Sequence, residues 1–181
     1  MRDELETERL RLRRWRFEDL DALTRWHNDP GLMRHMHKLS FTRQEMAADI
    51  ERYARHWEQH GFGLWAAEDK KTRTLIGRVG LAYHRVWPSD PEVGWLIDTP
   101  WQRRGYATEA GAACIDYAFG ELVFDRVVSI CTPQNVASKR VMEKLDFRVW
   151  QELRDEKHGL DLLLHVRDRV PKVSSVRDTG V

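Results

Sequence analysis

A short polar run, QRRGYA at residues 102–107, lies between a strand-like and a helical pattern. The apolar segment 93–97 precedes it, and small or apolar residues recur at helical spacing from 107 to 119. A helix that begins near Gly105 exposes unpaired backbone N–H groups and the positive end of its dipole, so it can hold an anion. The run therefore predicts a phosphate site. Its Q-x-x-G-x-A spacing differs from the glycine patterns of dinucleotide and nucleoside-triphosphate folds.

Length and composition fit one domain. Of 181 residues, 33% are charged and 41% are hydrophobic, and 30 basic against 29 acidic residues leave a net charge of +1. We expect a single domain over residues 1–170 and a disordered polar tail over 171–181. No segment has the length of a membrane span and the N-terminus lacks a signal-peptide apolar region, so a cytoplasmic protein without a membrane partner is expected. The near-neutral charge makes nucleic acid an unlikely partner.

The order of the expected elements indicates how the chain folds. Residues 10–12 alternate as a strand, 17–27 are helical, and 28–31 break that helix. Thr42 and Glu45 form a capping box for a helix that Gly61 ends. A hairpin of strands 62–68 and 75–83, a loop at 87–91 and a strand at 92–98 come next. After the helix from Gly105, the expected elements are strand 126–131, helix 135–145 and strands 147–153 and 160–166.

This order predicts the α/β class in its mixed α+β form. The expected architecture is a central, mixed, mostly antiparallel twisted sheet with helices on both faces. In mixed sheets of this kind, ligands favour the carboxyl ends of strands, where residues 102–107 lie.

Several other features have simple structural explanations. Cys114 and Cys131 lie in apolar segments and fit reduced core thiols. His56 and His60 have the spacing of a metal pair, but no third ligand is evident, so no metal is expected. The arginines at 9, 11, 13, 14 and 16 are interpreted as the solvent face of a strand rather than an RNA site. Core packing and the wall of an acceptor cleft both remain open for Trp15, Trp26, Met33, Met36 and Trp87.

Two longer segments carry a family resemblance. Residues 96–110, LIDTPWQRRGYATEA, and residues 135–147, NVASKRVMEKLDF, together resemble the GNAT superfamily of acetyl-CoA-dependent N-acetyltransferases. The opening ETERLRLR at residues 6–13 is typical of the branch that contains the ribosomal-protein N-terminal acetyltransferases. The resemblance covers nearly all of residues 6–166, and it implies acetyl-CoA as the co-substrate.

The resemblance also implies roles for individual residues. Backbone N–H groups would wrap the coenzyme A pyrophosphate along Arg103, Arg104, Gly105, Tyr106, Ala107 and Thr108. Ile97 would pair with the pantetheine arm, Asn135 would bond that arm or the ligand beside it, and Ser138 would lie near the thioester sulfur. Asn135 also fits a helix N-cap, and Ser138 also fits core packing. Two positions depart from the family's glycines. Asp146 tolerates the left-handed conformation of a helix stop, whereas Arg103 alters the phosphate loop.

The chemistry of amine acetylation adds further candidates. An alkylamine must lose a proton before it attacks a thioester, and we favour Glu92 as the acceptor of that proton, with His84 and Glu152 as weaker alternatives. Backbone N–H groups around Ile97 would stabilise the tetrahedral oxyanion, and Ser138 would assist the departing thiolate. Because acetyl-CoA is already activated, no covalent enzyme intermediate is needed. Glu109 is interpreted as a structural helix residue.

The sequence therefore predicts an N-acetyltransferase that passes the acetyl group of acetyl-CoA to a primary amine by direct attack. The acceptor would be a protein N-terminus or a small-molecule amine. The alternative is a non-catalytic acyl-CoA-binding or regulatory module. The oligomeric state, a homodimer included, stays open.

Overall fold

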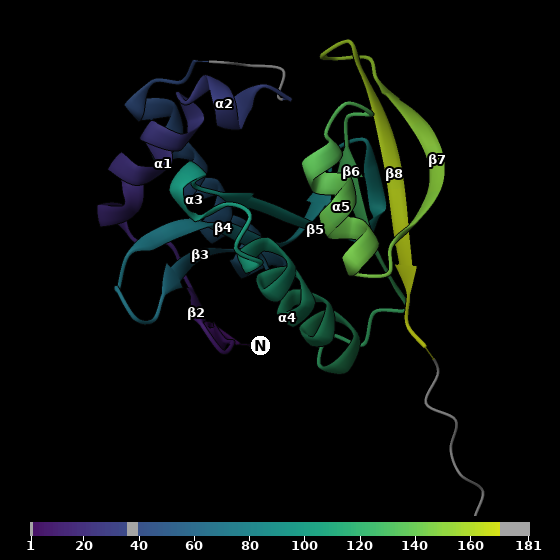
Figure 1. The fold of residues 1–181 in the computed structure, drawn as a ribbon, viewed down its shortest axis with the longest axis horizontal. Coiled ribbons are helices and arrows are strands. Elements are labelled where there is room, and N and C mark those ends of the chain that lie inside the picture. Colours follow the sequence, from purple (N-terminus) through teal and green to yellow (C-terminus); the bar gives the residue numbers. More distant parts are fainter. Residues whose placement is uncertain (1, 36–39, 171–181) are drawn as a thin grey trace, which may run out of the picture.

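One mixed sheet organises the chain. The structure is a computed structural model and describes residues 2–35 and 40–170. Met36 and the expected tail lie outside these ranges. Within them, eight strands follow the order β1-β2-β3-β4-β5-β6-β8-β7 (Figure 1). The strands are β1 (Leu5–Glu6), β2 (Leu10–Arg13), β3 (Leu64–Asp69), β4 (Leu75–His84), β5 (Trp87–Ile97), β6 (Arg126–Cys131), β7 (Arg148–Asp155) and β8 (Leu160–Asp168). β5 and β6 pair in parallel, and the other neighbours are antiparallel, which confirms the predicted fold class.

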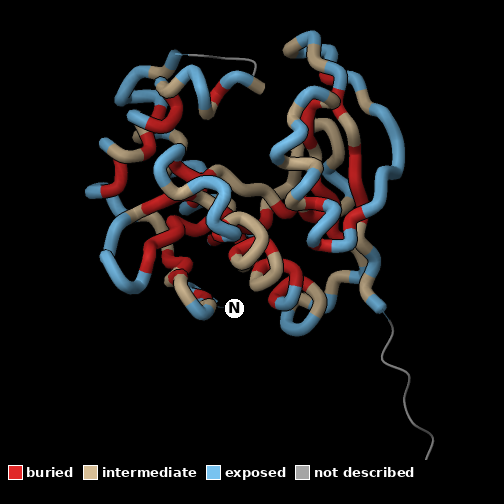
Figure 2. The backbone as a smooth tube through the Cα atoms, viewed as in Figure 1, coloured by how far each residue is buried: buried red, intermediate tan, exposed pale blue. Residues whose placement is uncertain are grey.

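Helices cover both faces of this sheet. They are η1 (Phe17–Asp19), α1 (Leu20–His27), α2 (Pro30–Met33), α3 (Arg43–His60), η2 (Thr99–Trp101), α4 (Tyr106–Gly120) and α5 (Val136–Lys144). On one face, Leu23 of α1 and Met46 of α3 belong to a core that packs against Leu96 of the sheet. On the other face, α4 buries Ala110 and Cys114 in the larger core (Figure 2). None of the helices in the described part of the chain is long and apolar enough to cross a membrane.

Local sequence signals set the ends of several elements as predicted. The Thr42 hydroxyl accepts from the Glu45 amide at 3.2 Å, and the Glu45 carboxylate accepts from the Thr42 amide at 2.7 Å. Gly61 ends α3 in the left-handed region, with φ of 75°. Asp146 adopts φ of 57° just after α5, which confirms the expected left-handed helix stop.

One expectation about a loop was wrong. Residues 87–91 belong to β5 although two of them are proline. Pro91 precedes the recorded pairing of Glu92 with β6, and Pro88 lies in an irregular stretch of β5 that has no recorded partner on β4, so neither position needs an N–H donor.

The predicted break at 28–31 is confirmed, because α1 ends at His27. The short α2 begins within this break at Pro30, and the Asp29 side chain caps its first turn by accepting from the Gly31 and Leu32 amides at 2.7 and 3.2 Å.

The arginines of the first strands do not all face solvent, which corrects a further expectation. Arg13 is buried, and its guanidinium pairs with Asp19 at 2.8 Å and with Glu68 at 3.1 Å. η1 carries Asp19 back over this face of β2, so the charged side chain is covered and compensated. Arg9 instead pairs with Glu109 of α4 at 2.6 Å, and Glu109 has the structural role that was expected.

Candidate functional site

The sheet splits between β5 and β6. These parallel strands share one recorded register pair, Glu92 with Val128, and they diverge beyond it. A regular parallel ladder would next join the Ile130 amide to the Val93 carbonyl. Here the Ile130 amide donates to the Glu92 carboxylate at 3.3 Å, and the Val93 carbonyl accepts from the Ser129 hydroxyl at 2.9 Å. The side chains of Glu92 and Ser129 therefore provide hydrogen-bond partners for the backbone groups at the point where the strands separate.

The split leaves an edge of β5 without a strand partner. The Val93 carbonyl faces β6, whereas the Asp98 amide bonds Ile76 of β4 at 2.8 Å. Since main-chain groups alternate sides along a strand, Trp95 and Ile97 also face the gap. The Ile97 carbonyl is occupied by the Gln102 side-chain amide at 2.9 Å. The N–H groups of Trp95 and Ile97 are therefore turned toward the space where sequence reasoning placed the pantetheine arm.

The loop that follows β5 is shaped by two left-handed residues. We call residues 102–105 the Gly105 loop. Arg103 has φ of 61° and Gly105 has φ of 85°, and α4 begins directly afterwards without a side-chain cap. A Cβ at Gly105 would lie 3.3 Å from Nη2 of Arg9, whose Nη1 donates to the Arg104 carbonyl at 2.9 Å. The first-turn N–H groups of α4, including those of Ala107 and Thr108, thus have no side-chain cap, and the binding role predicted for them stays a prediction.

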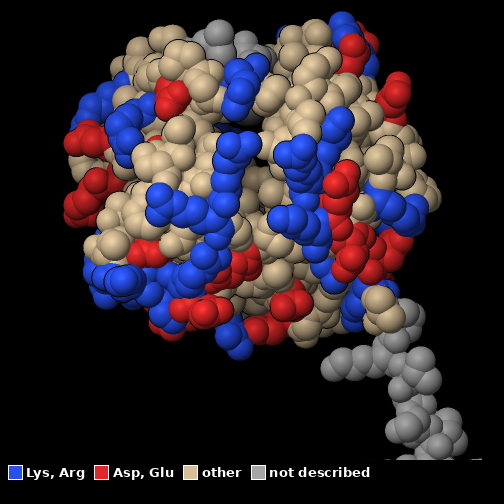
Figure 3. Space-filling model, viewed as in Figure 1, with Lys and Arg blue, Asp and Glu red and all other residues tan. Residues whose placement is uncertain are grey.

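Basic side chains surround this region. Figure 3 shows the surface hollowed between the half that carries β2–β5 and the half that carries β6–β8, with Lys and Arg on both rims. Arg103 and Arg104 are exposed beside α4, and Lys139 and Arg140 lie on α5. Tyr106 differs from them, because its side chain is buried and its hydroxyl donates to Asp69 at 3.0 Å. Only its main chain fits the predicted binding role.

The start of α5 holds the second predicted pair of residues. The Asn135 side-chain oxygen accepts from the Ser138 amide at 3.1 Å, so Asn135 is the N-cap of α5. Ser138 is half-buried, and its hydroxyl has no hydrogen-bond partner among the described residues. α5 follows the carboxyl end of β6 as α4 follows that of β5, so both helices begin beyond the diverging strands.

Glu92 has the environment of a proton acceptor. Burial raises the pKa of its carboxyl to about 7, although the Ile130 amide and the Arg78 charge oppose the rise. It lies within β5, not at the strand start where it was expected. Of the two weaker candidates, Glu152 is exposed on β7. Burial lowers the pKa of His84, and its Nδ1 accepts from the Val86 amide at 3.2 Å.

Sequence reasoning missed two polar residues in the strands of this region, Arg78 and Ser129. Arg78 of β4 is partly buried, and its Nη1 donates to the Tyr53 hydroxyl of α3 at 2.7 Å. The Ser129 hydroxyl of β6 donates to the Val93 carbonyl of β5. An arginine or a serine inside an apolar strand carries no sequence signal of its own, because its partners lie on other strands and helices.

The other sulfur and imidazole groups do not form a reactive cluster. Burial raises the pKa of Cys131 to about 11 and that of Cys114 still further, so both thiols stay protonated and are poor nucleophiles. His56 uses its ring nitrogens on the Phe62 carbonyl at 2.8 Å and the Tyr83 amide at 3.4 Å. Within residues 2–35 and 40–170, no three His, Cys, Asp or Glu side chains are arranged to hold a metal ion.

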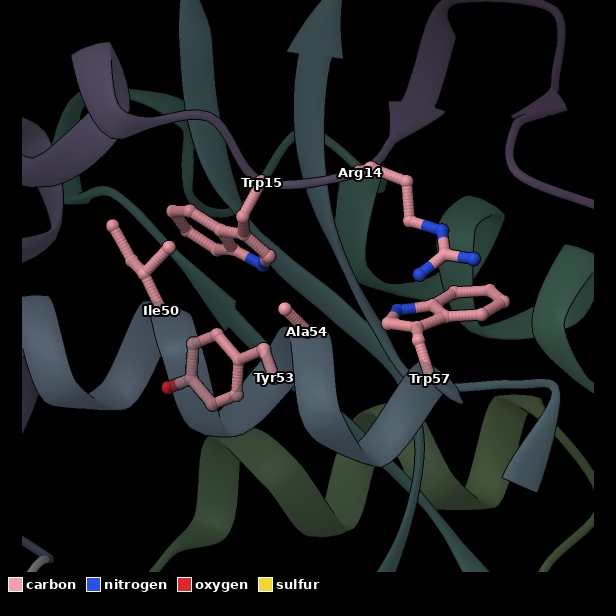
Figure 4. A pocket seen from close by; sticks show the side chains of 6 residues that line it. All are labelled: Arg14, Trp15, Ile50, Tyr53, Ala54 and Trp57. Atoms are coloured by element: carbon pink, nitrogen blue, oxygen red, sulfur yellow. The ribbon is translucent and has the colours of Figure 1, made fainter. Parts of the chain in front are cut away.

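Two cavities lie away from the split. The first, about 100 Å³, is lined by Trp15 and by α3 side chains, and the Arg14 guanidinium stacks 3.8 Å from the Trp57 ring beside it (Figure 4). Trp26 and Met33 are fully buried, so core packing accounts for them. The second cavity, about 370 Å³, lies beside the start of α4 and includes Arg9, Lys70 and Lys71 in its lining.

Comparison with known proteins shows which class this fold belongs to. Residues 9–148 match the family described as "Acetyltransferase (GNAT) domain". The chain belongs to this family and is an acetyltransferase. YkkB of Bacillus subtilis is 33% identical over 154 residues, which are 83% of this chain and 88% of that protein. The uncharacterized N-acetyltransferase YnaD of the same organism is 29% identical, over 78% of this chain and 81% of its own.

A solved structure supports the same assignment. The acetyltransferase from Agrobacterium tumefaciens superposes with a TM-score of 0.81 at 26% identity, and the match covers 93% of this chain and 96% of that one. The likeness therefore extends over the whole sheet and its helices.

Proposed function

We propose that this protein transfers the acetyl group of acetyl-CoA to a primary amine by direct attack. The observation that carries the proposal is the unpaired edge of β5, which runs from Glu92 at the split to the Gly105 loop. A thioester carrier laid along that edge would place its reactive end near a carboxylate and its diphosphate at a helix N-terminus. The family membership supports the same chemistry.

The donor would be held mainly by main-chain groups. The first-turn N–H groups of α4 and the left-handed Gly105 suit a diphosphate, and Arg103 and Arg104 add positive charge. The amide and carbonyl of Trp95 and the amide of Ile97 suit the amide groups of a pantetheine arm, which would bond them as a strand does. Asn135 would act on the ligand through the edge of its amide that the α5 cap leaves free.

The transfer would proceed by deprotonation of the amine, attack on the thioester and departure of the thiolate. The ammonium of the acceptor loses its proton to Glu92, and the nitrogen lone pair forms a bond to the acetyl carbon. The carbonyl oxygen gains the electron pair, and the N–H groups of Trp95 and Ile97 stabilise it. The C–S bond then breaks and the carbonyl re-forms. The thiolate leaves with hydrogen bonding and a proton from Ser138, and the second amine proton restores that hydroxyl.

The acceptor is a primary amine in this proposal. A protein N-terminus and a small-molecule amine are the two acceptor classes that this chemistry admits. A single domain over residues 1–170 and a cytoplasmic location are part of the same proposal. So is the expectation that neither nucleic acid nor a metal is needed.

Thiol release from acetyl-CoA across a panel of amines tests the proposed function. Turnover with at least one amine, together with heat of acetyl-CoA binding in calorimetry, is the expected result. A protein that binds acetyl-CoA but releases no thiol with any amine would instead be a binding module. If calorimetry detects no binding of any acyl-CoA, the proposed donor site itself is refuted.

A further inference from the structure

Arg78 stands out among the arginines of this protein. Every other arginine that is buried or partly buried in the described residues has a carboxylate oxygen within 4.0 Å, as Arg13 has with Asp19 and Arg126 with Asp168. Arg78 has none. Its one hydrogen bond in the same residues goes to the neutral Tyr53 hydroxyl. The charges of Asp49 and Glu92 act on this guanidinium from beyond 4.0 Å, and both raise its pKa. A partly buried guanidinium without a paired carboxylate is costly, so an anion supplied by a ligand is the natural partner.

The position of Arg78 places that missing anion beside the split. In the β4–β5 register, Arg78 lies opposite Leu96, Gly80 opposite Gly94, and Ala82 opposite Glu92. Side chains of these three rows share one face of the sheet, and the bond from Arg78 to Tyr53 shows that it is the face covered by α3. The guanidinium and the carboxylate therefore flank a row made of two glycines.

The space over that glycine row is open on the β5 side. A Cβ added at Gly94 would have no atom within 4 Å, whereas one at Gly80 would lie 2.3 Å from the Gly63 carbonyl. Gly80 is thus required by close strand packing, but nothing in the described structure fills the room above Gly94. The register places both side chains on the face that borders this room, and they are close enough for the Arg78 charge to lower the pKa of Glu92 against the effect of burial.

From this arrangement we infer that the acceptor is a small amine that also carries a carboxylate, with the amine at Glu92 and the carboxylate on Arg78. The inference rests on the proposed function and names its substrate class. The planar guanidinium presents paired donors that match a carboxylate, and one Nη remains free of Tyr53. A peptide N-terminus offers an amide carbonyl at the corresponding place, so it leaves Arg78 without its counter-charge.

Matched amines provide the test. Thiol release is measured with serine, β-alanine and γ-aminobutyrate, and with serinamide, β-alaninamide, propylamine and a short peptide with a blocked C-terminus. The carboxylate-bearing amines should exceed their amides in kcat/KM by about 10- to 100-fold, the range expected for a charge-assisted pair. The amine-to-carboxylate spacing that gives the highest kcat/KM will indicate how far apart the two charges of the site lie at Glu92 and Arg78.

Two variants assign this preference to the arginine. The rates are compared above about pH 9, where Glu92 is ionised in both proteins, because removal of the Arg78 charge also raises the pKa of Glu92. There Arg78→Met should lower kcat/KM by at least about 10-fold for the carboxylate amines while it changes that of the amides less than about 3-fold. Arg78→Lys keeps a charge but lacks the paired donors, so its kcat/KM for the carboxylate amines should lie between the values of the parent and of Arg78→Met. It replaces the Met variant if that protein does not fold. Arg55→Met is the matched control, since Arg55 is exposed on α3 and already pairs with Glu51.

Tyr53→Phe tests how the guanidinium is positioned. The loss of its 2.7 Å bond should raise KM for the carboxylate amines several-fold, with kcat and the amide reactions unchanged. Equal rates for acids and amides, or equal losses of both in Arg78→Met, would overturn the inference and leave the proposed function standing. If no amine releases thiol and acetyl-CoA gives no heat, both are overturned.

Discussion

The main-chain amide of Ile130 donates to the Glu92 carboxylate at 3.3 Å, in place of the ladder bond to Val93. Ser129 supplies the bond that Val93 would otherwise lose. Because a buried unpaired backbone group is unfavourable, this exchange allows the two strands to separate without leaving such groups at the apex. The carboxylate that ends the strand pairing is thus the same group that faces the gap with a raised pKa.

Glu92→Gln should nearly abolish turnover. The amide oxygen can still accept from Ile130, so the split is kept, but the side chain can no longer take the amine proton. We expect kcat to fall by about 100-fold or more, with the acetyl-CoA dissociation constant within about 2-fold of the parent value. Glu152→Gln, at an exposed carboxylate of β7, is the control and should be fully active. A Glu92→Gln enzyme with a third of the parent activity would show that another group accepts the proton.

The pH dependence of activity and of stability should run in opposite directions. Glu92 acts when ionised, so kcat/KM should rise as pH increases through about 7 and then level off. The folded state holds this proton more tightly than the unfolded chain, whose carboxyl titrates near 4.5, so stability should fall as pH rises from 4.5 to about 7. Since one pKa unit corresponds to about 1.4 kcal/mol, the loss between pH 4 and 8 is on the order of 3 kcal/mol. Urea unfolding at both pH values should show a smaller decline for Glu92→Gln, and parallel declines would contradict the raised pKa.

Much of the fold is predictable because its signals are local. The capping box at Thr42, the stop at Gly61 and the helix after Gly105 each depend on residues within one or two helical turns. The turn at Gly105 was also predictable, because glycine takes the left-handed conformation that this helix start uses, whereas the anion site there stays a prediction. Where local signals conflict, the prediction failed: Pro88 and Pro91 favour a loop, but they lie in β5 at positions outside every recorded register pair.

The acceptor side of the site was beyond sequence reasoning. Arg78 and Tyr53 are 25 positions apart, and only the packing of α3 on β4 joins them. Ser129 and Val93 are brought together by the single parallel pairing in the sheet. Glu92 was proposed from its position before the Gly105 loop, but its burial and its bond to Ile130 follow from the split, which no local pattern encodes.

Ser138→Ala separates a role in thiol departure from packing. The hydroxyl has no partner among the described residues, so its removal leaves no group unsatisfied, and stability should change by less than about 0.5 kcal/mol. We expect kcat to fall by about 10-fold while acetyl-CoA affinity is kept. Ala137→Ser, one residue away on an exposed position of α5, controls for the helix and should leave kcat unchanged. Equal kcat for parent and Ser138→Ala would show that the hydroxyl only packs.

Two substitutions at Asn135 separate its role as a helix cap from a role as a ligand contact. Asn135→Ala removes the 3.1 Å bond to the Ser138 amide and should lower the unfolding free energy by about 1 kcal/mol. Asn135→Asp keeps a capping oxygen but removes the side-chain N–H donors, so stability should be retained. If Asn135 also contacts the co-substrate, Asn135→Asp should bind acetyl-CoA more weakly than the parent in calorimetry although its stability is unchanged. Equal affinity for both would restrict Asn135 to capping.

Gly105→Val tests the donor site itself. The residue has φ of 85°, where a β-branched side chain is strained, and its Cβ would approach Arg9 Nη2 at 3.3 Å. The loop must therefore shift away from the geometry that presents the first-turn N–H groups, and acetyl-CoA should bind more than about 10-fold more weakly. Gly120→Ala, at the far end of the same helix, meets nothing within 4 Å and should bind normally with stability unchanged or raised by up to about 1 kcal/mol. Parent-like affinity in a folded Gly105→Val protein would place the diphosphate elsewhere, because no arrangement that uses the α4 N-terminus tolerates that displacement.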